Sequence, residues 1–322
     1  MLENFALATL SEGNSPPFVA LVKDGQATAL NAVDFGAAGL LDLLRRWAEL
    51  LPQFKALAAG DLAGAKPLGS YRIHAPYRPD QVFCTGANYK KHVLGLMADE
   101  TMRTGEDAAL SAEQRLVAVA QRLEERAKNG TPYCFIKLPS CVVGPHDDVV
   151  LPRNVQKPDW ELELGVVIGK RARHVTEAEA MDFVAGFAVV NDVTARELVF
   201  RRGPGAGIGA DWLSGKCFPT FLPFGPFIVP RDCVADWRDL TIKLSVNGTV
   251  YQNETTADML FGVERQVAYL SERVELMPGD LICTGSPYGN GSAFGVVLKP
   301  GDVMEGAITG LGAQRNRCVA EA

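Results

Sequence analysis

The sequence predicts an α+β fold, mostly β, in which a small N-terminal domain over residues 1–75 precedes a larger domain over residues 76–322. The 322 residues exceed the roughly 100–200 residues of a common single domain. After Lys137 the chain becomes rich in short apolar runs separated by Pro and Gly, which is typical of strands joined by turns. The pair Asn247-Gly248 is a strong signal for a two-residue hairpin. Together these features predict a β-rich domain with few helices.

Composition and charge exclude several classes of protein. Hydrophobic residues make up 47% of the chain and charged residues 22%, so disorder, collagen and coiled coil are poor descriptions. The 32 basic and 38 acidic residues give a net charge of −6 with no long basic run, which argues against a nucleic-acid partner. No apolar stretch approaches the roughly 18 residues of a membrane helix, and the N-terminus lacks the positive start of a secretory signal. We therefore expect no membrane partner and a cytoplasmic location.

Seven cysteines are scattered along the chain and form no CxxC pair. Such a pattern predicts neither a disulfide framework nor a thiolate zinc site. We expect buried, reduced thiols.

The first 70 or so residues predict a small unit of strand and helix. An apolar run over residues 18–22 predicts a strand, and residues 34–54 predict a Leu-rich helix. Within that helix Leu40, Leu44 and Trp47 recur at helical spacing, as expected for its buried face.

The larger domain begins with a predicted strand over residues 81–84, followed by a polar insertion over residues 96–130. In the second half of the insertion, Ser111 and Gln114 have the spacing of a capping box, which predicts a helix from about residue 111 to 128. An exposed helix at this place could cover a site.

Two further helices are predicted to interrupt the β-rich region. The first covers residues 176–185 and begins with a Thr-x-x-Glu capping box, and the second covers residues 258–273. Pro-Gly-Asp triplets at 278–280 and 300–302 predict turns that each lead into a strand.

The most informative segment carries two glutamates at a strand's period. Glu161 and Glu163 would share one face of a strand, about 6 to 7 Å apart. On a surface strand they would form an ordinary solvated face. However, the strand continues as the apolar run 166–168, which predicts burial on both faces, where unpaired carboxylates are costly. A divalent cation is the simplest neutraliser, and oxygen ligands favour Mg²⁺, Mn²⁺ or Ca²⁺ over Zn²⁺.

A third ligand is expected at the end of another strand. The apolar run 187–190 leads into Asn191-Asp192, which places Asp192 where strand gives way to loop. Asp192 could complete a triad with the two glutamates. A helix cap or turn residue is the alternative interpretation.

Five segments of the chain, taken with these acidic residues, resemble the fumarylacetoacetate hydrolase family. They are Trp160 to Glu163, Asn191 to Arg196, Gly215 to Phe221 followed by Gly225-Pro226, Cys283 to Pro287, and Gly310 to Gly312 with Arg315 to Arg317. Their order and spacing agree with the family from about Val82 to the C-terminus, some three quarters of the chain. The first 70 residues resemble the variable N-terminal domain that such proteins often carry.

The resemblance implies a mixed β-sandwich roll that forms a homodimer. It also implies one Mg²⁺ or Mn²⁺, which Ca²⁺ can replace in crystals, held by Glu161, Glu163 and Asp192. Members of the family hydrolyse C–C bonds in acylpyruvates and fumarylacetoacetate, decarboxylate oxaloacetate, or isomerise and hydrate related compounds. Their common feature is an enolate whose two oxygens chelate the metal, which acts as a Lewis acid. A small dicarbonyl or 2-oxo acid is therefore the expected partner.

The resemblance also assigns roles to five other residues. His92 matches the family histidine that activates water as a general base, and Lys216 matches a lysine near the metal, so both are expected to be catalytic. Tyr89, Arg196 and Thr284 are expected to bind substrate. Thr284 would donate to a substrate carboxylate, and Arg196 would also brace the carboxylates of the metal site.

One position departs from the family pattern. Many family hydrolases and decarboxylases carry a glutamate three residues after the histidine, where this chain has Gly95. Glu100, Glu106 or Glu113 of the insertion could replace that glutamate when a lid closes. Alternatively, the water is handled differently, or the reaction needs no water.

Three hypotheses follow. The first is a metal-dependent hydrolase that cleaves a C–C bond in a 2,4-dioxo or acylpyruvate-type acid. The second, favoured by Gly95, is a lyase or isomerase on the same scaffold, such as an oxaloacetate-type decarboxylase or a 2-oxo acid dehydratase or isomerase. The third is a non-catalytic protein that keeps the fold, which would require a decayed metal site.

Four segments could decide specificity and assembly. Side-chain specificity is expected to lie in the N-terminal domain, the insertion and residues 201–208. The hydrophobic stretch 218–229 fits an interface patch between subunits as well as it fits core.

Overall fold

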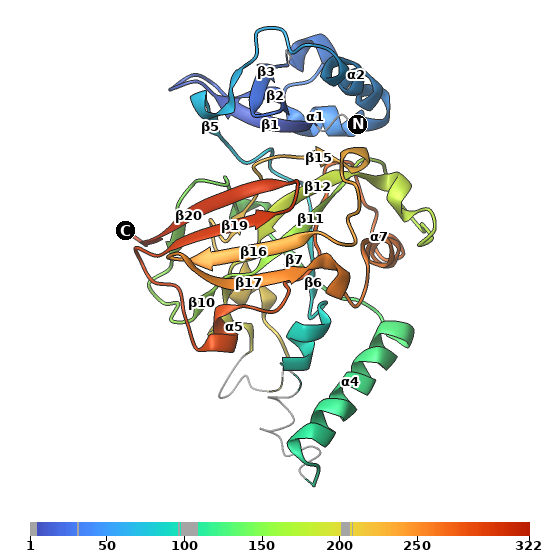
Figure 1. Ribbon diagram of the computed structural model, residues 1–322, viewed down its shortest axis with the longest axis vertical. Coiled ribbons are helices and arrows are strands. Elements are labelled where there is room, and N and C mark those ends of the chain that lie inside the picture. Colours follow the sequence, from blue (N-terminus) through green and yellow to red (C-terminus); the bar gives the residue numbers. More distant parts are fainter. Residues whose placement is uncertain (1–4, 31, 96, 98–108, 201–206, 208) are drawn as a thin grey trace.

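The computed structural model describes residues 5–30, 32–95, 97, 109–200, 207 and 209–322, and within these residues it contains three sheets of five or six strands and two sheets of two strands. Figure 1 shows a small N-terminal sheet with its helices above a larger β-sandwich, and one long helix on the opposite side of the sandwich. The α+β, mostly β fold class is confirmed.

The N-terminal sheet has five strands in the order β4-β3-β2-β1-β5. Its elements are β1 (Ala6–Ser11), β2 (Phe18–Lys23), β3 (Gln26–Ala29), β4 (Lys66–Pro67), β5 (Arg72–Ile73), α1 (Leu40–Arg45) and α2 (Trp47–Ala59). The predicted strand at 18–22 is confirmed. The single helix predicted over 34–54 is wrong in detail, because Arg46 leaves helical geometry with φ −117° and ψ 26° and separates two helices. The chain turns there so that Leu44 and Trp47 both reach the core.

A six-stranded mixed sheet forms the centre of the larger domain, in the order β15-β12-β11-β18-β6-β7. Its strands are β6 (Val82–Gly86), β7 (Tyr133–Lys137), β11 (Leu162–Ile168), β12 (Val184–Asn191), β15 (Val229–Pro230) and β18 (Leu281–Cys283). Only the contact of β18 with β6 is parallel among these pairings of described strands. The strand predicted at 81–84 is therefore confirmed as β6.

A five-stranded sheet packs against it, in the order β17-β16-β19-β20-β9. Its strands are β9 (Val149–Leu151), β16 (Thr241–Val246), β17 (Thr249–Thr255), β19 (Val303–Ile308) and β20 (Gly312–Ala320). The predicted hairpin is confirmed: Val246 pairs with Thr249, and Asn247 and Gly248 have φ of 50° and 80°. Both values suit a primed two-residue turn, whose backbone follows the twist of the strands.

The strand β11 is buried on both faces, as its apolar run predicts. Leu162 and Leu164 belong to the core cluster between the two sheets, together with Leu244 of β16. Val167 lies in the cluster on the other face, which also contains Trp47 of the N-terminal region. The glutamates of this segment are therefore held by a strand that has no solvated face.

The other elements are short, apart from two helices. The longer helices are α4 (Ala112–Asn129) and α7 (Val263–Ser271). The short elements are β8 (Val142–Val143), β10 (Pro158–Asp159), β13 (Thr194–Ala195), β14 (Leu222–Pro223), α5 (Arg196–Val199), α6 (Trp212–Lys216) and 3₁₀ turns at Ala32–Phe35, Leu68–Ser70, Pro139–Cys141, Ala180–Phe183, Arg231–Cys233, Thr256–Asp258 and Gly291–Phe294. None of the helices in the described ranges combines the length and the apolar character that crossing a membrane requires.

Three helix predictions have different outcomes. The capping box of α4 is confirmed, since the Ser111 hydroxyl accepts from the Gln114 amide and the Gln114 side chain accepts from the Ser111 amide. The helix at 258–273 is confirmed as the shorter α7. The helix at 176–185 is wrong: the Glu179 carboxylate accepts from the Thr176 amide, but the Thr176 hydroxyl donates to that carboxylate and does not accept from the Glu179 amide. Only a 3₁₀ turn follows before Val184 enters β12.

The hydrophobic stretch 218–229 belongs largely to the core. Phe221, Phe224 and Ile228 are fully buried within the chain. Side chains that are already packed inside one subunit cannot provide an interface patch, so these residues give no support to a dimer.

Candidate active site

Two neighbouring strands bring the three predicted carboxylates together. Glu161 directly precedes β11, Glu163 lies on it, and Asp192 follows β12, whose last residue pairs with Leu162. The Asp192 amide donates to the Glu161 carbonyl at 2.9 Å, which fixes the two strand ends relative to each other. One ligand atom from each carboxylate lies within 4.8 Å of the others, and all three residues are buried.

Two buried lysines compensate part of this negative charge. Lys216, at the end of α6, donates to Glu161 Oε2 at 2.6 Å and also to Asp192 Oδ2. Lys137, at the end of β7, donates to Asp192 Oδ1 at 2.7 Å and to the Val193 carbonyl at 3.0 Å. Lys137 was not among the site residues predicted from the sequence. It could have been found because it ends an apolar strand, and a lysine is rarely buried unless it pairs with an acidic group.

An arginine and an aspartate support the cluster from one side. The Arg196 guanidinium donates from Nε to Asp159 Oδ2 at 2.8 Å and forms an ion pair with Glu161. The Asp159 carboxylate also accepts from the amides of Gly291 at 2.7 Å and Ser292 at 3.1 Å. Arg196 is thereby tied to the loop that borders the carboxylates.

The electrostatics of the two glutamates differ. Burial would raise the pKa of Glu161, but Arg196 and Lys216 lower it to about 2. Burial, together with the charge of Asp192, raises the pKa of Glu163 well above its usual value. Glu163 accepts a hydrogen bond from the Gly285 amide at 2.8 Å, and it forms no ion pair with any lysine or arginine in the described ranges.

This donor set fits a divalent cation. The three side chains offer only carboxylate oxygens, the ligand type that suits Mg²⁺, Mn²⁺ and Ca²⁺. A cation would also supply the partner that Glu163 lacks among the described residues. The arrangement therefore supports a divalent metal, and it fits Zn²⁺ poorly.

His92 faces the same cavity as the carboxylates. It lies in the helical residues 90–95, and burial lowers its pKa to about 4 although Glu161 acts in the opposite direction. The imidazole is therefore neutral near pH 7 and able to accept a proton.

The space beside Gly95, the position at which many family members carry a glutamate, contains few atoms of the described residues. Gly95 is exposed, and a Cβ built there would have only Tyr288 Cε2 within reach, at 4.0 Å. Glu113 is exposed on the first turn of α4 and does not line the cavity. Glu100 and Glu106 lie outside the described residues, as do most residues of the 201–208 segment.

A cavity of about 510 Å³ contains most of the predicted site residues. Six of them line it: His92, Glu161, Glu163, Asp192, Arg196 and Lys216. Tyr89 and Thr284 do not line it, and both are fully buried beside it. The Thr284 hydroxyl donates to the Leu164 carbonyl at 2.9 Å, so it supports the strand rather than facing the cavity.

The sequence analysis also missed the apolar wall of the cavity. Its lining residues are Ala87, Tyr133, Phe135, Val199, Phe200 and Trp212. They come from β6, β7, α5 and α6 and from the residues that follow these elements, so no single stretch of sequence shows them as a group.

Comparison with protein families gives one match over most of the chain. The family model described as fumarylacetoacetate (FAA) hydrolase, C-terminal, matches residues 81–319.

Similar curated proteins carry two kinds of name. The human protein named oxaloacetate tautomerase FAHD2A, mitochondrial, is 40% identical over 244 residues, which cover 75% of this chain and 67% of that protein. The 2,4-didehydro-3-deoxy-L-rhamnonate hydrolase of a Sphingomonas species is 42% identical over 212 residues, which cover 63% of this chain and 72% of the other.

Solved structures are similar over nearly the whole chain. A fumarylacetoacetate hydrolase from Exiguobacterium antarcticum has a TM-score of 0.76 at 27% identity, covering 98% of this chain and 100% of that one. A maleylpyruvate hydrolase from Sphingobium, solved with manganese(II) and pyruvate, has a TM-score of 0.71 at 25% identity, covering 98% and 100%.

Proposed function

The chain belongs to the fumarylacetoacetate hydrolase family, and on that premise we propose that it is a divalent-metal-dependent enzyme that interconverts the keto and enol forms of a 2-oxo acid. The main support for the proposal is that three buried carboxylates and a neutral histidine line one cavity. Carboxylates suit a metal, and an uncharged imidazole suits proton transfer.

Glu161, Glu163 and Asp192 are the proposed metal ligands, with Mg²⁺ or Mn²⁺ as the metal. When bound, such a cation acts as a Lewis acid and stabilises negative charge on the oxygens of a 2-oxo acid. Lys137 and Lys216 hold Asp192 from two sides, so its carboxylate keeps one orientation.

His92 is the proposed proton carrier. It takes a proton from the carbon beside the keto group and delivers it to the enolate oxygen, so that a C–H bond breaks and an O–H bond forms. In the reverse direction it moves the proton back to carbon. Lys216 lines the same cavity and keeps its charge, because Asp192 and Glu161 raise its pKa more than burial lowers it. Its ammonium can stabilise the negative oxygen that develops when the proton leaves.

Tautomerisation is favoured over hydrolysis because of Gly95. Cleaving a C–C bond with water requires a group that orients and activates the water, and the usual histidine–glutamate pair is incomplete here. Moving one proton between carbon and oxygen requires no water. The similarity to proteins named oxaloacetate tautomerase supports this choice.

Cleavage of a C–C bond in a 2,4-dioxo acid is the second candidate. It is favoured by the 42% identity to a protein named as a hydrolase of a didehydro-deoxy sugar acid. Hydrolysis would use the same carboxylates and His92, with the water activated by a group other than the glutamate that Gly95 replaces.

The test compares both reactions on the purified protein with Mg²⁺ or Mn²⁺ and with EDTA. Loss of the enol absorbance of oxaloacetate reports tautomerisation, and identification of pyruvate and a second acid from acetylpyruvate reports hydrolysis. We expect metal-dependent acceleration of the first reaction and a loss of about 10²-fold or more in His92→Ala.

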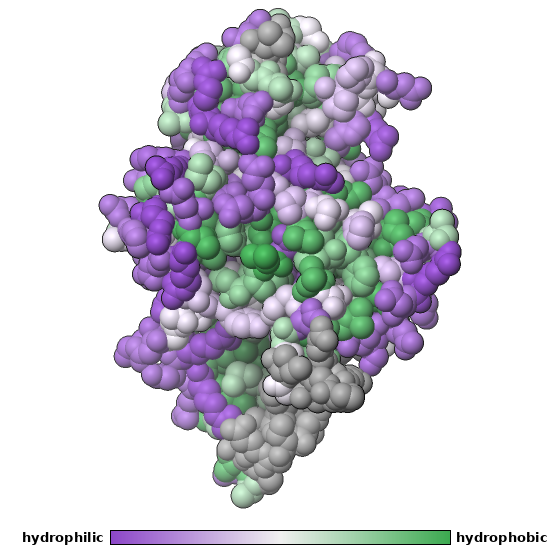
Figure 2. Space-filling view, turned by 180° about the vertical axis from the view of Figure 1, so that it is seen from behind, coloured by the Kyte–Doolittle hydropathy of each residue, from purple (hydrophilic) through white to green (hydrophobic). Residues whose placement is uncertain are grey.

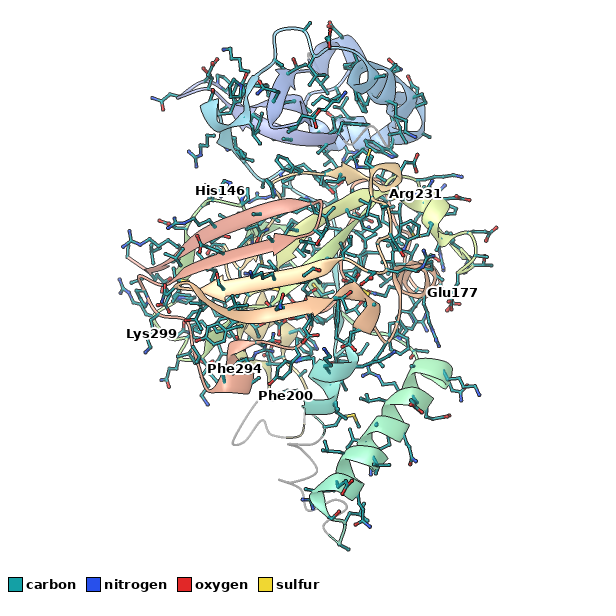
Figure 3. All side chains as sticks on the ribbon, viewed as in Figure 1. His146, Glu177, Phe200, Arg231, Phe294 and Lys299 are labelled. Atoms are coloured by element: carbon teal, nitrogen blue, oxygen red, sulfur yellow. The ribbon has the colours of Figure 1, made fainter. Side chains whose placement is uncertain are left out.

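A matched variant and a clear contrary result complete this experiment. His146→Ala removes an exposed histidine that does not line the cavity (Figure 3), and it should leave the rate unchanged. Unchanged tautomerisation in His92→Ala, or equal rates with metal and EDTA, would contradict the proposal. Pyruvate release from acetylpyruvate without tautomerase activity would replace it with the second candidate.

The assembly and location are also proposals. We propose a homodimer, on the family resemblance, and a cytoplasmic location. Light scattering on a sizing column gives the mass in solution, and a monomer of 34.7 kDa would contradict the dimer.

A further inference from the structure

The cavity has a charged end and an apolar end. Glu161, Glu163 and Asp192 mark the charged end, with the cations that pair with them. The apolar end consists of the wall residues given above, five of which are aromatic or β-branched: Tyr133, Phe135, Val199, Phe200 and Trp212. The proposed reaction concerns only the charged end.

The aromatic side chains form a continuous series that starts at the charged end. The Lys216 ammonium lies 5.2 Å from the centre of the Phe135 ring. Phe135 is stacked on Trp212, with ring centres 4.3 Å apart and an angle of 11° between the planes. Trp212 continues to Tyr133, with ring centres 5.8 Å apart, and donates from Nε1 to the Tyr133 hydroxyl at 2.8 Å.

Exposure increases along this series. Phe135 is 9% exposed and Tyr133 is 47% exposed, and Phe200, which lines the same cavity, is 63% exposed. Figure 3 shows Phe200 at the lower end of the sandwich. Large aromatic side chains that line a cavity and remain open offer ring faces on which another ring can stack.

The size of the cavity also exceeds the needs of a small acid. Its volume of about 510 Å³ lies within the range of roughly 300–1,000 Å³ found for sites that bind drug-sized ligands. A three-carbon 2-oxo acid bound at the carboxylates would leave the apolar end empty.

The charges of the wall favour a ring over a second carboxylate. Among the described lining residues, the cationic side chains are Arg196 and Lys216, and both already pair with carboxylates at the charged end. A distant carboxylate on the substrate would lose its water without gaining an ion-pair partner from these residues. An aryl group would bury apolar surface against the aromatic series instead.

We propose that the apolar end is an aryl subsite, so that the preferred substrate is a 2-oxo acid with an aromatic ring attached beyond its reacting carbons. Tyr133, Phe135, Phe200 and Trp212 form the subsite. The inference rests on the proposed function, because a substituent could reach the rings only if the 2-oxo acid head were bound at the carboxylates of the same cavity.

The test uses three ligands that share one head group: pyruvate, oxaloacetate and phenylpyruvate. Their dissociation constants are measured by calorimetry in the presence of Mn²⁺, so that the readout does not depend on turnover. We expect phenylpyruvate to bind about tenfold or more tightly than either of the others, because only its ring can be buried at the apolar end.

Two variants and a control assign the preference to the subsite. Phe200→Ala and Tyr133→Leu should each reduce the preference for phenylpyruvate over pyruvate by about threefold or more while pyruvate affinity stays the same. Leu213→Ala removes an exposed apolar side chain next to Trp212 that does not line the cavity, and it should change neither affinity. A preference that is absent from the wild type, or equal in all variants, would overturn the inference.

The same experiment separates failure of the inference from failure of the proposed function. If oxaloacetate is tautomerised but phenylpyruvate binds no more tightly than pyruvate, the aryl subsite is wrong and the proposed function stands. If phenylpyruvate binds preferentially but no 2-oxo acid is tautomerised, the subsite is supported and the proposed reaction is wrong.

Discussion

The ion pairs of the active site and those of the N-terminal sheet join lysines to carboxylates at similar distances, yet they differ in exposure. Lys137 contacts Asp192 at 2.7 Å with side chains that are 0% and 1% exposed. Lys66 contacts Glu12 at 2.5 Å with side chains that are 52% and 53% exposed. Water and salt screen the second pair, whereas the first has given up its hydration completely.

The distance between two charges therefore does not determine how much an ion pair contributes to the stability of the fold. A buried pair has a high desolvation cost, and replacing both partners by apolar residues often leaves stability unchanged or improves it. Retaining six ionisable side chains in one cluster, five of them buried and Arg196 27% exposed, is therefore better explained by chemistry than by stability. The members of this cluster are Lys137, Glu161, Glu163, Asp192, Arg196 and Lys216.

The largest effect is expected from breaking the buried pair on one side. Lys137→Met should destabilise the protein by about 3–5 kcal/mol, because Asp192 is left buried with one cation fewer. Urea unfolding of the protein with EDTA measures the change. Adding Asp192→Asn to Lys137→Met should restore part of the lost stability. If Lys137→Met alone were as stable as wild type, the cluster would have to be solvated.

A buried carboxylate without a cation should give a smaller effect that depends on pH. Burial raises the pKa of Asp280 to about 6, although the Met277 amide and the Gln81 side chain donate to it. Its pKa is higher in the folded than in the unfolded protein, so the ionised form weakens the fold above about pH 6. That penalty disappears as the pH falls through 6 toward the ordinary value of 3.8.

The variant Asp280→Asn tests this sign. At pH 7.5 it should be more stable than wild type by about 1–2 kcal/mol, after allowance for solvent screening and the changed hydrogen bonds. The difference should shrink between pH 7.5 and 5 in parallel unfolding curves. A difference that is constant over this range would mean that Asp280 does not titrate there.

A helix cap on the exposed insertion should have a local effect of about 1 kcal/mol. Ser111→Ala removes the acceptor of the Gln114 amide at the start of α4. Hydrogen exchange of the amides in the first turn of α4 should become faster by about fivefold, while exchange in β11 stays the same. Ser111→Asp keeps an acceptor and should retain protection, and faster exchange in β11 as well would show that α4 supports the sandwich.

The smallest effect is expected from the exposed ion pair. Lys66→Ala should leave the melting temperature unchanged within error at physiological salt, because water replaces the lost contact. A clear drop in the melting temperature would contradict the distinction between the two kinds of pair.

Local patterns in the sequence predicted those parts of the fold that depend on neighbouring residues. The period of β11, the turn at Asn247-Gly248 and the capping box at Ser111 are all properties of a few adjacent positions. The helix expected at 176–185 failed because a Thr-x-x-Glu pattern concerns only one turn of chain, whereas the strand that starts at Val184 is fixed by its partners in the sheet.

Site residues that lie on one strand could be predicted from the sequence. Site residues brought together from several elements could not. Glu161 and Glu163 follow from the period of one strand. Lys137 was missed because its partner Asp192 is 55 residues away in the sequence, and the stacking of Phe135 on Trp212 joins β7 to α6 in the same way. Tyr89 and Thr284 belong to conspicuous segments, but packing places both outside the cavity surface.

The parallel contact between β18 and β6 has a consequence for the synthesis of the chain. Leu281 pairs with Val82, about 200 residues earlier. Until β18 has been made, nothing joins the strands β15-β12-β11 to the pair β6-β7 in the six-stranded sheet. At roughly 5–20 residues per second, a ribosome needs about 10–40 s to cover that interval. During this time β6 and β11 present unpaired edges, which makes the nascent chain a candidate for chaperone binding. A truncation before residue 281 would make that state permanent.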